Sequence, residues 1–155
     1  MIKAVAGAFT GEIGLGVELL SPLEHPVYAF DPHRIQYDAA KMIMEIESME
    51  LAPFARVVAL VDADLFVPVL TFVFGEARKG GRVAVVSSFR LEDELERVIK
   101  IALHEFGHLC MLDHCSENLC VMNFSKGLGQ LDSVPTYYCR YCLSQVRYMS
   151  GLLPG

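Results

Sequence analysis

The run His104-Glu105-Phe106-Gly107-His108 is the part of this sequence that most directly indicates chemistry. Residues four apart lie on one face of an α-helix, so His104 and His108 can offer two imidazole nitrogens to one metal ion. Glu105 lies about a quarter turn from His104, where its carboxylate can reach a water on the metal without coordinating the metal itself. The pattern predicts a zinc site at which Glu105 is the general base.

A third ligand is predicted at the next histidine. His114 lies six residues after His108 and is too far along the chain to share its helical face. We therefore expect the helix to end between these residues and the chain to fold back, so that His114 completes an open tripod. Zinc held by three protein ligands keeps a fourth position for water or substrate. The alternative is that these histidines are ordinary polar groups of a packed helix.

Four of the five cysteines form a second group with the spacings C-x4-C and C-x2-C, namely Cys115, Cys120, Cys139 and Cys142. This spacing fits a closed zinc site of four thiolates, which has no open position for substrate and therefore a structural role. Such a site would supply folding free energy to residues 116–138, which are poor in core-forming side chains. The alternative is two disulfides, which need an oxidising compartment. The remaining Cys110 is predicted to be a buried or half-buried thiol.

Together these motifs resemble the archaemetzincins, a branch of the metzincin zinc proteases. The resemblance rests on His104-Glu105-x-x-His108, His114-Cys115, Cys120-x-Met122 and Cys139-x-x-Cys142. Upstream, residues 62–68, 72–77 and 81–88 are similar to the family's central strands, and residues 31–37 resemble the segment that leads into its first long helix. The resemblance covers roughly residues 28–142.

The resemblance implies a zinc metallopeptidase with two zinc ions, one catalytic and one structural. His104, His108 and His114 would bind the catalytic zinc, and Glu105 would be the general base. Met122 would form a hydrophobic floor beneath that zinc. The second zinc would be held by Cys115, Cys120, Cys139 and Cys142. Zinc would lower the pKa of its water, and Glu105 would take the proton and pass it to the leaving amine.

One residue departs from the family's extended motif. The position seven after the first histidine is glycine in that motif and Met111 here. If the backbone there is left-handed, a non-glycine residue costs roughly 1–2 kcal/mol, which packing of the long side chain could offset. Relief of that strain by Met111→Gly should then tighten the catalytic zinc. The departure also supports a second hypothesis, a catalytically inert zinc-binding protein of metzincin fold that binds peptides or proteins.

The length of 155 residues predicts a single metalloprotease-like domain over residues 1–155, with an upper half at about 1–110 and a lower half at about 111–155. Residues 65–75 form an eleven-residue stretch without charge, which is too short to span a bilayer. No export signal is recognisable, so we expect a cytoplasmic protein without a membrane partner. The net charge of −6 argues against a third hypothesis, a nucleic-acid-binding zinc ribbon, and leaves a peptide or protein as the expected partner.

The predicted fold is mixed α/β (α+β) and metzincin-like, with a twisted mixed sheet, two backing helices and an irregular, zinc-stabilised C-terminal half. Strands are predicted at residues 2–8, 27–30 and 57–61, and at 70–77 and 82–88, which form a hairpin around 78–81. Helices are predicted at residues 37–50, from the acidic run 92–94 to the zinc motif, and near 143–149.

Two surfaces of these elements have predicted roles. The face of the zinc helix that packs on the core should contain Leu95, Val98, Ile99, Ala102, Phe106 and Leu109. The two histidines should lie nearly opposite, beside Arg97 and Ile101. The metzincin architecture implies that the lower edge strand of the sheet binds an extended peptide by strand addition. The strand at 70–77, with Leu70, Phe72 and Phe74, is the candidate, and the alternative is an interior strand.

Overall fold

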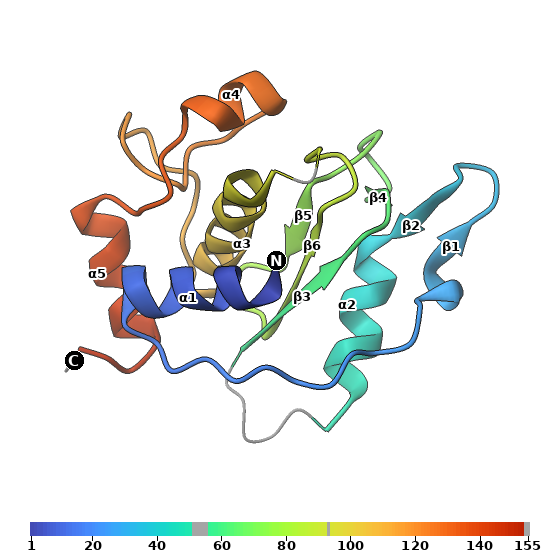
Figure 1. The fold of residues 1–155 in the computed structure, drawn as a ribbon, viewed down its shortest axis with the longest axis horizontal. Helices are drawn as coiled ribbons and strands as arrows, with labels where there is room; N and C mark the ends of the chain where they lie inside the picture. Colours follow the sequence, from blue (N-terminus) through green and yellow to red (C-terminus); the bar gives the residue numbers. More distant parts are fainter. Residues whose placement is uncertain (51–55, 93, 154–155) are drawn as a thin grey trace.

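A three-stranded mixed sheet lies between two helices that cover its opposite faces (Figure 1). The computed structural model describes residues 1–50, 56–92 and 94–153. Its helices within these ranges are α1 (Ile2–Ile13), the 3-10 helix η1 (Val27–Ala29), α2 (Ala39–Ser48), α3 (Leu95–Leu109), α4 (Leu128–Ser133) and α5 (Arg140–Met149). The strands are β1 (Phe30–Asp31), β2 (Gln36–Asp38), β3 (Val57–Val61), β4 (Leu65–Phe66), β5 (Gly75–Ala77) and β6 (Val83–Ser87).

The central strand of this sheet is β6, which runs parallel to β3 and antiparallel to β5. All five residues of β6 are buried because each face of the strand meets a helix. Val83 and Val85 pack in the cluster that includes α2, whereas Ala84 and Val86 pack in the cluster that includes α3. A strand covered on both faces is apolar at every position, as this one is apart from Ser87. The mixed α/β fold, the strand at 57–61 and the hairpin around 78–81 are thus confirmed.

A second small sheet has the order β1-β2-β4 and leads into α2. The carboxylate of Asp38 caps α2 by accepting hydrogen bonds from the backbone N–H of Ala40 at 2.9 Å and of Lys41 at 3.2 Å. The predicted helix at 37–50 is confirmed in the shorter range of α2. The predicted strand at 27–30 is wrong for most of its length, because a 3-10 turn follows Pro26 and only Phe30 enters a strand.

The predicted strand at residues 2–8 is wrong, since this segment begins helix α1. Val5, Phe9 and Ile13 are buried at a spacing of four residues, which is one face of a helix. The alanines between them favour helix and conceal this period in a short window. Gly14 ends the helix in the left-handed conformation, at φ 89°, and its N–H donates to the carbonyl of Thr10 at 3.0 Å.

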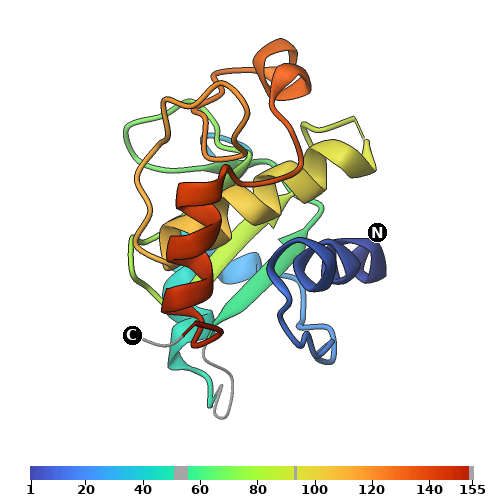
Figure 2. The ribbon, with the colours of Figure 1, turned by 90° about the vertical axis from the view of Figure 1, so that its left-hand side faces the viewer.

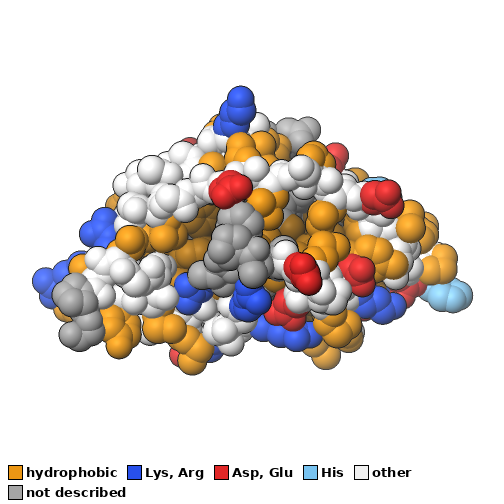
Figure 3. All heavy atoms as spheres, turned by 90° about the horizontal axis from the view of Figure 1, so that it is seen from below, with side chains coloured by type: hydrophobic (Ala, Val, Ile, Leu, Met, Phe, Trp, Pro, Cys, Tyr) orange, Lys and Arg blue, Asp and Glu red, His pale blue; other side chains and the backbone are white. Residues whose placement is uncertain are grey.

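A segment without regular secondary structure connects α1 to η1 along the lower side of the molecule (Figure 1). Its aliphatic side chains are 42 to 55% exposed at Val17, Leu19, Leu20 and Leu23. Figure 3 shows hydrophobic side chains spread among charged ones over the face seen from below. Among the described helices, none combines the length and apolarity that crossing a bilayer requires.

Helix α3 is buried on more sides than predicted. The core-facing positions that are buried as expected are Val98, Ala102, Phe106 and Leu109. Leu95 at the start of the helix is 39% exposed, and Ile101, predicted on the open side, is only 7% exposed. The reason is that Ile101 packs against the edge strand β5, where a Cβ atom on Gly75 would lie 2.9 Å from its Cγ2 atom. The helix begins after Glu94 as predicted, and Asp93 lies outside the described residues.

The C-terminal half contains α4, which was not predicted, and α5, which is longer than the predicted helix at 143–149. Helix α5 lies beside α1 (Figure 2). Arg147 on α5 donates to the carbonyls of Ile13 at 3.0 Å and Glu12 at 3.3 Å. The hydroxyl of Tyr138 donates to the carbonyl of Leu103 on α3. The N-terminal helix and α3 therefore hold the C-terminal half, while its division from the upper half at residue 110 stays a prediction.

The predicted strand at 70–77 is only partly formed, because β5 is limited to Gly75–Ala77. Leu70, Phe72 and Phe74 precede it in irregular backbone, apart from a single bridge between Val73 and Leu65. The strand does lie at the edge of its sheet, as predicted.

Side chains replace the missing strand pairing in this segment. Arg34 donates to the carbonyls of Leu70 at 2.7 Å and Thr71 at 3.2 Å, and Gln36 donates to the carbonyl of Thr71 at 2.9 Å. The guanidinium of Arg90 lies 4.4 Å from the centre of the Phe72 ring. The apolar alternation of the segment resembles a strand, but its carbonyls are satisfied by groups distant in sequence.

Replacement of Phe9 by alanine should lower the free energy of unfolding by about 3–5 kcal/mol. The ring is 5% exposed and meets the Phe106 ring edge to face, with centroids 5.1 Å apart. Ile2→Ala is the matched control on the same helix, where a 50% exposed side chain should change stability by no more than about 0.5 kcal/mol. Chemical denaturation measures both, and equal losses would contradict the buried face described for α1.

Candidate metal centres

Three imidazoles converge at the C-terminal end of α3. The candidate ligand nitrogens of His104, His108 and His114 all lie within 4.8 Å of one another. The Nε2 atoms of His104 and His108 are 3.1 Å apart. Nitrogens about 2.05 Å from one tetrahedral zinc would be separated by about 3.3 Å. The structure thus brings together the three predicted ligands in an arrangement that fits a zinc ion.

Backbone carbonyls fix the orientation of two of these rings. The Nδ1 atom of His104 lies 2.9 Å from the carbonyl oxygen of Val121, and the Nδ1 atom of His108 lies 2.9 Å from that of Leu112. A ring that donates from Nδ1 leaves Nε2 deprotonated and available to a metal. Both carbonyls belong to the chain after α3, so that segment orients ligands that stand on the helix.

The surroundings favour the neutral form of His104 and His114. Burial lowers the pKa of His104 to about 4, and nearby His108 and His114 act in the same direction. Burial, followed by the effect of His108, also lowers the pKa of His114 below its usual value. Neutral imidazole is the form that coordinates metal, so these residues are ready for a ligand role at neutral pH.

The chain leaves α3 through a left-handed turn at Met111, whose φ is 67°. The N–H of Leu112 donates to the carbonyl of Gly107 and the N–H of Met111 to that of His108, both at 3.0 Å. This is the Schellman pattern of helix termination, in which the left-handed residue is usually glycine. The backbone of Met111 is therefore left-handed, and this conformation costs roughly 1–2 kcal/mol for a residue with a side chain.

Glu105 projects from α3 toward the edge strand β5. Its side chain is almost fully buried, with 8% of the residue exposed. A Cβ atom on Gly75 would lie 2.8 Å from Cγ of Glu105, so only glycine lets strand and carboxylate approach this closely. Burial, together with the negative charge of Glu76, raises the pKa of Glu105 to about 8. The Glu105 carboxyl is thus shielded from solvent, on the helical turn that carries His104 and His108.

Met122 lies beneath the same turn of α3 and is fully buried. A Cβ atom on Gly107 would collide with its Sδ atom, so this glycine makes room for the methionine. The carbonyl of Met122 accepts a hydrogen bond from the N–H of Cys115 at 2.9 Å, which joins the irregular segment that carries His114 to the turn that carries Met122. This is the place that a hydrophobic floor for the tripod requires.

The second predicted group is also brought together. The Sγ atoms of Cys115, Cys120, Cys139 and Cys142 all lie within 4.8 Å of one another. Those of Cys115 and Cys139 are 4.0 Å apart, whereas four sulfurs about 2.3 Å from one ion would be separated by about 3.8 Å. All five cysteines are free thiols, which disfavours the disulfide alternative. Cys110 is buried as predicted and lies apart, with its Sγ 3.9 Å from Oγ of Ser150.

Backbone N–H groups point at two of these sulfurs. The N–H of Cys139 lies 3.3 Å from Sγ of Cys120, and the N–H of Glu117 lies 3.4 Å from Sγ of Cys115. Such donors stabilise a thiolate, the form that binds zinc. The four thiols therefore fit a closed zinc site by their number, spacing and hydrogen bonding.

Several groups around the tripod were not identified from the sequence. Phe124 stacks on His114 with ring centroids 4.9 Å apart and is 57% exposed, so it forms an aromatic wall beside the third histidine. Gly75 gives Glu105 its space, and the carbonyls of Leu112 and Val121 orient the rings. Phe124 stands two residues after Met122 and could have been noticed. The other three act through backbone, which a residue type does not reveal.

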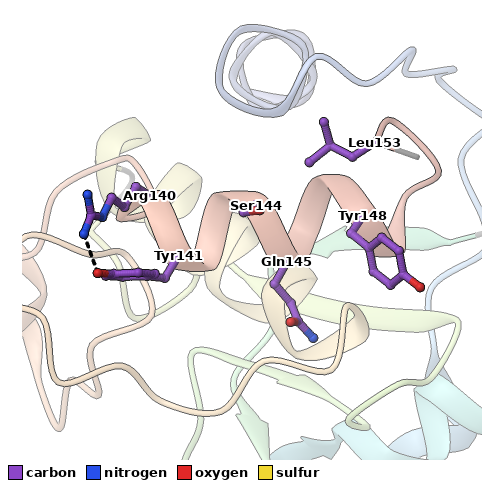
Figure 4. A pocket seen from close by; sticks show the side chains of 6 residues that line it. All are labelled: Arg140, Tyr141, Ser144, Gln145, Tyr148 and Leu153. Carbon is purple, nitrogen blue, oxygen red and sulfur yellow. Dashed lines mark hydrogen bonds between the residues drawn. The ribbon is translucent and has the colours of Figure 1, made fainter. Parts of the chain in front are cut away.

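A separate hollow lies on the outer face of α5 (Figure 4). It is lined by Arg140, Tyr141, Ser144, Gln145, Tyr148 and Leu153. Arg140 donates a hydrogen bond to the hydroxyl of Tyr141. None of the predicted site residues borders this hollow, so the chemistry that the sequence indicates is concentrated at the end of α3.

Comparisons with known proteins identify the family of this chain. A family model described as Peptidase family M54 matches residues 8–148. The archaemetzincin of Aeropyrum pernix is 38% identical over 133 residues, which cover 81% of this chain and 73% of the relative.

Solved structures extend the likeness to the fold. The crystal structure of archaemetzincin from Methanopyrus kandleri has a TM-score of 0.88 and 34% identity, and the match covers 97% of this chain and 86% of that one. A zinc-dependent peptidase from Methanocorpusculum labreanum has a TM-score of 0.81 and 27% identity, with 93% and 92% covered. The chain therefore belongs to peptidase family M54, the archaemetzincins, and is a zinc metallopeptidase.

Proposed function

We propose that this enzyme hydrolyses peptide bonds at a zinc ion held by His104, His108 and His114, with Glu105 as the general base. The observation that supports this assignment most directly is the convergence of three imidazoles, with their nitrogens within 4.8 Å of one another, next to a buried carboxyl on the same helical turn. Zinc in a site of three neutral ligands lowers the pKa of a bound water and polarises a carbonyl.

The chain's own residues account for the proton transfers. The carboxylate of Glu105 accepts a proton from the attacking water and later donates it to the leaving amine. Burial raises the pKa of the Glu105 carboxyl to about 8. A group whose pKa lies near the working pH of the enzyme can both accept and release a proton. The positive charge of a nearby metal ion would favour the ionised form that the first step needs.

The edge strand β5 is the proposed binding site for the substrate backbone. An extended peptide would pair with Gly75–Ala77, on the side away from β6, by strand addition. The close approach of Gly75 to Glu105 then puts the bound peptide next to the base. The aromatic residues Phe72 and Phe74, whose ring centroids are 5.4 Å apart, precede the strand and would contact substrate side chains rather than its backbone.

The cysteine group is proposed to bind a second, structural zinc through Cys115, Cys120, Cys139 and Cys142. The segment between the two cysteine pairs contains one six-residue helix, α4, and is otherwise irregular, so a metal cross-link would add stability that secondary structure does not. Four unbridged thiols suit a reducing compartment, which supports the cytoplasm as the place of action.

Elemental analysis of the purified protein should find two zinc ions per chain, because the two ligand sets share no residue. Joint replacement of His104 and His108 by alanine should reduce the content to one. The matched control is the joint replacement of His25 and His33 by alanine, which removes as many imidazoles outside the site and should leave two. A single zinc ion that survives the His104 and His108 replacements would rule out the tripod.

A mild chelator should remove zinc in two steps, with the tripod losing its ion first. Three neutral imidazoles hold zinc less firmly than four thiolates do. The first step should change the thermal midpoint little, and the second should lower it strongly because the C-terminal half loses its cross-link. Cys142→Ser should abolish the second step, whereas Cys110→Ser is the matched control that keeps both. A first step that is sensitive to Cys142→Ser but not to His104→Ala would reverse the assignment.

Glu105→Gln should reduce peptide cleavage by about 10²–10⁴-fold while both zinc ions and the fold remain, since the residue moves protons and coordinates nothing. Glu94→Gln, at an exposed position at the start of the same helix, is the control and should cleave like the wild type. Cleavage over a peptide library and zinc content are the measurements. Wild-type rates in Glu105→Gln would exclude this base, and an inactive wild type with both zinc ions would favour the inert binder.

A further inference from the structure

We propose that the tip of the β5–β6 hairpin, residues 78–81, is a positioning device for the zinc ligand His114 and acts through the side chain of Met111. The inference rests on the proposed function, because it concerns the same histidine site. It explains how this chain keeps a left-handed turn with a methionine at the position where the extended motif has glycine.

The side chain of Met111 lies over Gly80. A Cβ atom on Gly80 would be only 2.5 Å from Sδ of Met111, so a larger residue there would displace the methionine. Gly80 also has a left-handed backbone, with φ at 71°. The contact therefore depends on glycine at position 80 for two reasons, its conformation and the space that it leaves. The extended motif has its glycine at the position of Met111, whereas in this chain the glycine of the contact is Gly80 on the hairpin.

Two further contacts join the hairpin tip to the same turn. The N–H of Gly80 donates to the carbonyl of His108 at 2.9 Å, and Nζ of Lys79 lies 2.6 Å from a carboxylate oxygen of Asp113. The hairpin tip thus contacts the turn at His108, Met111 and Asp113. The Lys79 and Asp113 side chains are 43% and 83% exposed, so their ion pair contributes little, and the backbone hydrogen bond and the methionine contact dominate.

The position of this turn determines the surroundings of two zinc ligands. Leu112, the next residue, provides the carbonyl that orients the His108 ring. His114 follows three residues after Met111 and is exposed, with Phe124 stacked on its ring. Because α3 fixes the backbone positions of His104 and His108, the position of the third ligand depends on the direction in which the chain leaves Met111. A tip that holds Met111 therefore lowers the cost of arranging the third ligand.

The proposal predicts coupling between positions 80 and 111 in zinc affinity. Gly80→Ala should weaken zinc binding at the tripod by about tenfold, because the new Cβ displaces Met111. The same substitution in a Met111→Gly background should change the affinity less than about threefold, since no side chain is left to displace. The measurement is competition with a chromophoric chelator on the full chain, with the tripod step identified as the one absent from the His104→Ala, His108→Ala protein.

A matched control separates positioning from general destabilisation. Gly151 has φ at 73°, but a Cβ atom there would meet nothing within 4 Å. Gly151→Ala should therefore lower the thermal midpoint through backbone strain and leave the tripod affinity unchanged. Release of the thiolate-bound zinc is the internal reference and should be alike in all variants. Equal loss of tripod affinity in Gly80→Ala and Gly151→Ala would overturn the proposal.

Substitutions at Met111 test the same contact if Gly80→Ala fails to fold. Met111→Ala keeps the strained backbone and loses the contact, so tripod affinity should fall by about tenfold. Met111→Gly relieves the strain, which alone would tighten zinc as expected from the sequence, but it also loses the contact with Gly80. The two effects oppose each other, so its affinity should stay within about threefold of the wild type. A tenfold gain in Met111→Gly would show that the methionine only adds strain, and the positioning role would be wrong. A wild type without tripod zinc would instead refute the proposed function itself.

Discussion

The whole site depends on how the chain reverses at the end of α3. A helix can present two histidines on one face, but the third must come from residues that have left the helix, and the reversal is complete within the few residues between His108 and His114. The carbonyls that orient the helical histidines come from the same outgoing chain, at Leu112 and Val121. The geometry of a metal site on a rigid helix is thus decided by a segment that has no regular secondary structure. A site of this kind needs that segment to be fixed from several sides.

The rest of the molecule provides those fixed points. Tyr138 donates its hydroxyl to the carbonyl of Leu103 on α3 and its backbone N–H to the carboxylate of Glu12 at 2.9 Å, next to the cysteine pair that begins α5. Arg147 joins α5 to the end of α1. The four thiols then connect this anchored region to the residues that directly follow His114. A structural metal at these thiols would transmit the rigidity of the helices to the third histidine, because Cys115 directly follows His114 in the sequence.

The metal-binding groups could be predicted because their residue types and spacings carry the chemistry, and the predicted partners do meet in space. For Met111 the sequence supported only a conditional prediction, because it did not show whether the backbone there is left-handed. That conformation depends on Gly80, which lies on the distant β5–β6 hairpin. The errors in the predicted strands have two physical causes. Residues 70–74 have the alternation of a strand, yet Arg34 and Gln36, from another part of the chain, satisfy the carbonyls of Leu70 and Thr71. In α1 the error was one of period, because alanines fit both spacings and hid the repeat of Val5, Phe9 and Ile13. Local pattern predicts local chemistry, and it does not specify which distant group completes a hydrogen bond.

Glu105 shows how the fold and the proposed chemistry constrain each other. A carboxyl group without a positive partner is costly to bury, and the raised pKa expresses that cost. A surface position on α3 would avoid it but would leave the base among competing waters and far from the edge strand. Gly75 is what makes the buried position possible, because any side chain there would push β5 away from α3. The same glycine that shelters Glu105 brings the proposed peptide-binding edge into contact with it. The burial of Glu105 is therefore best understood as a consequence of bringing base, metal ligands and edge strand together around one turn of helix.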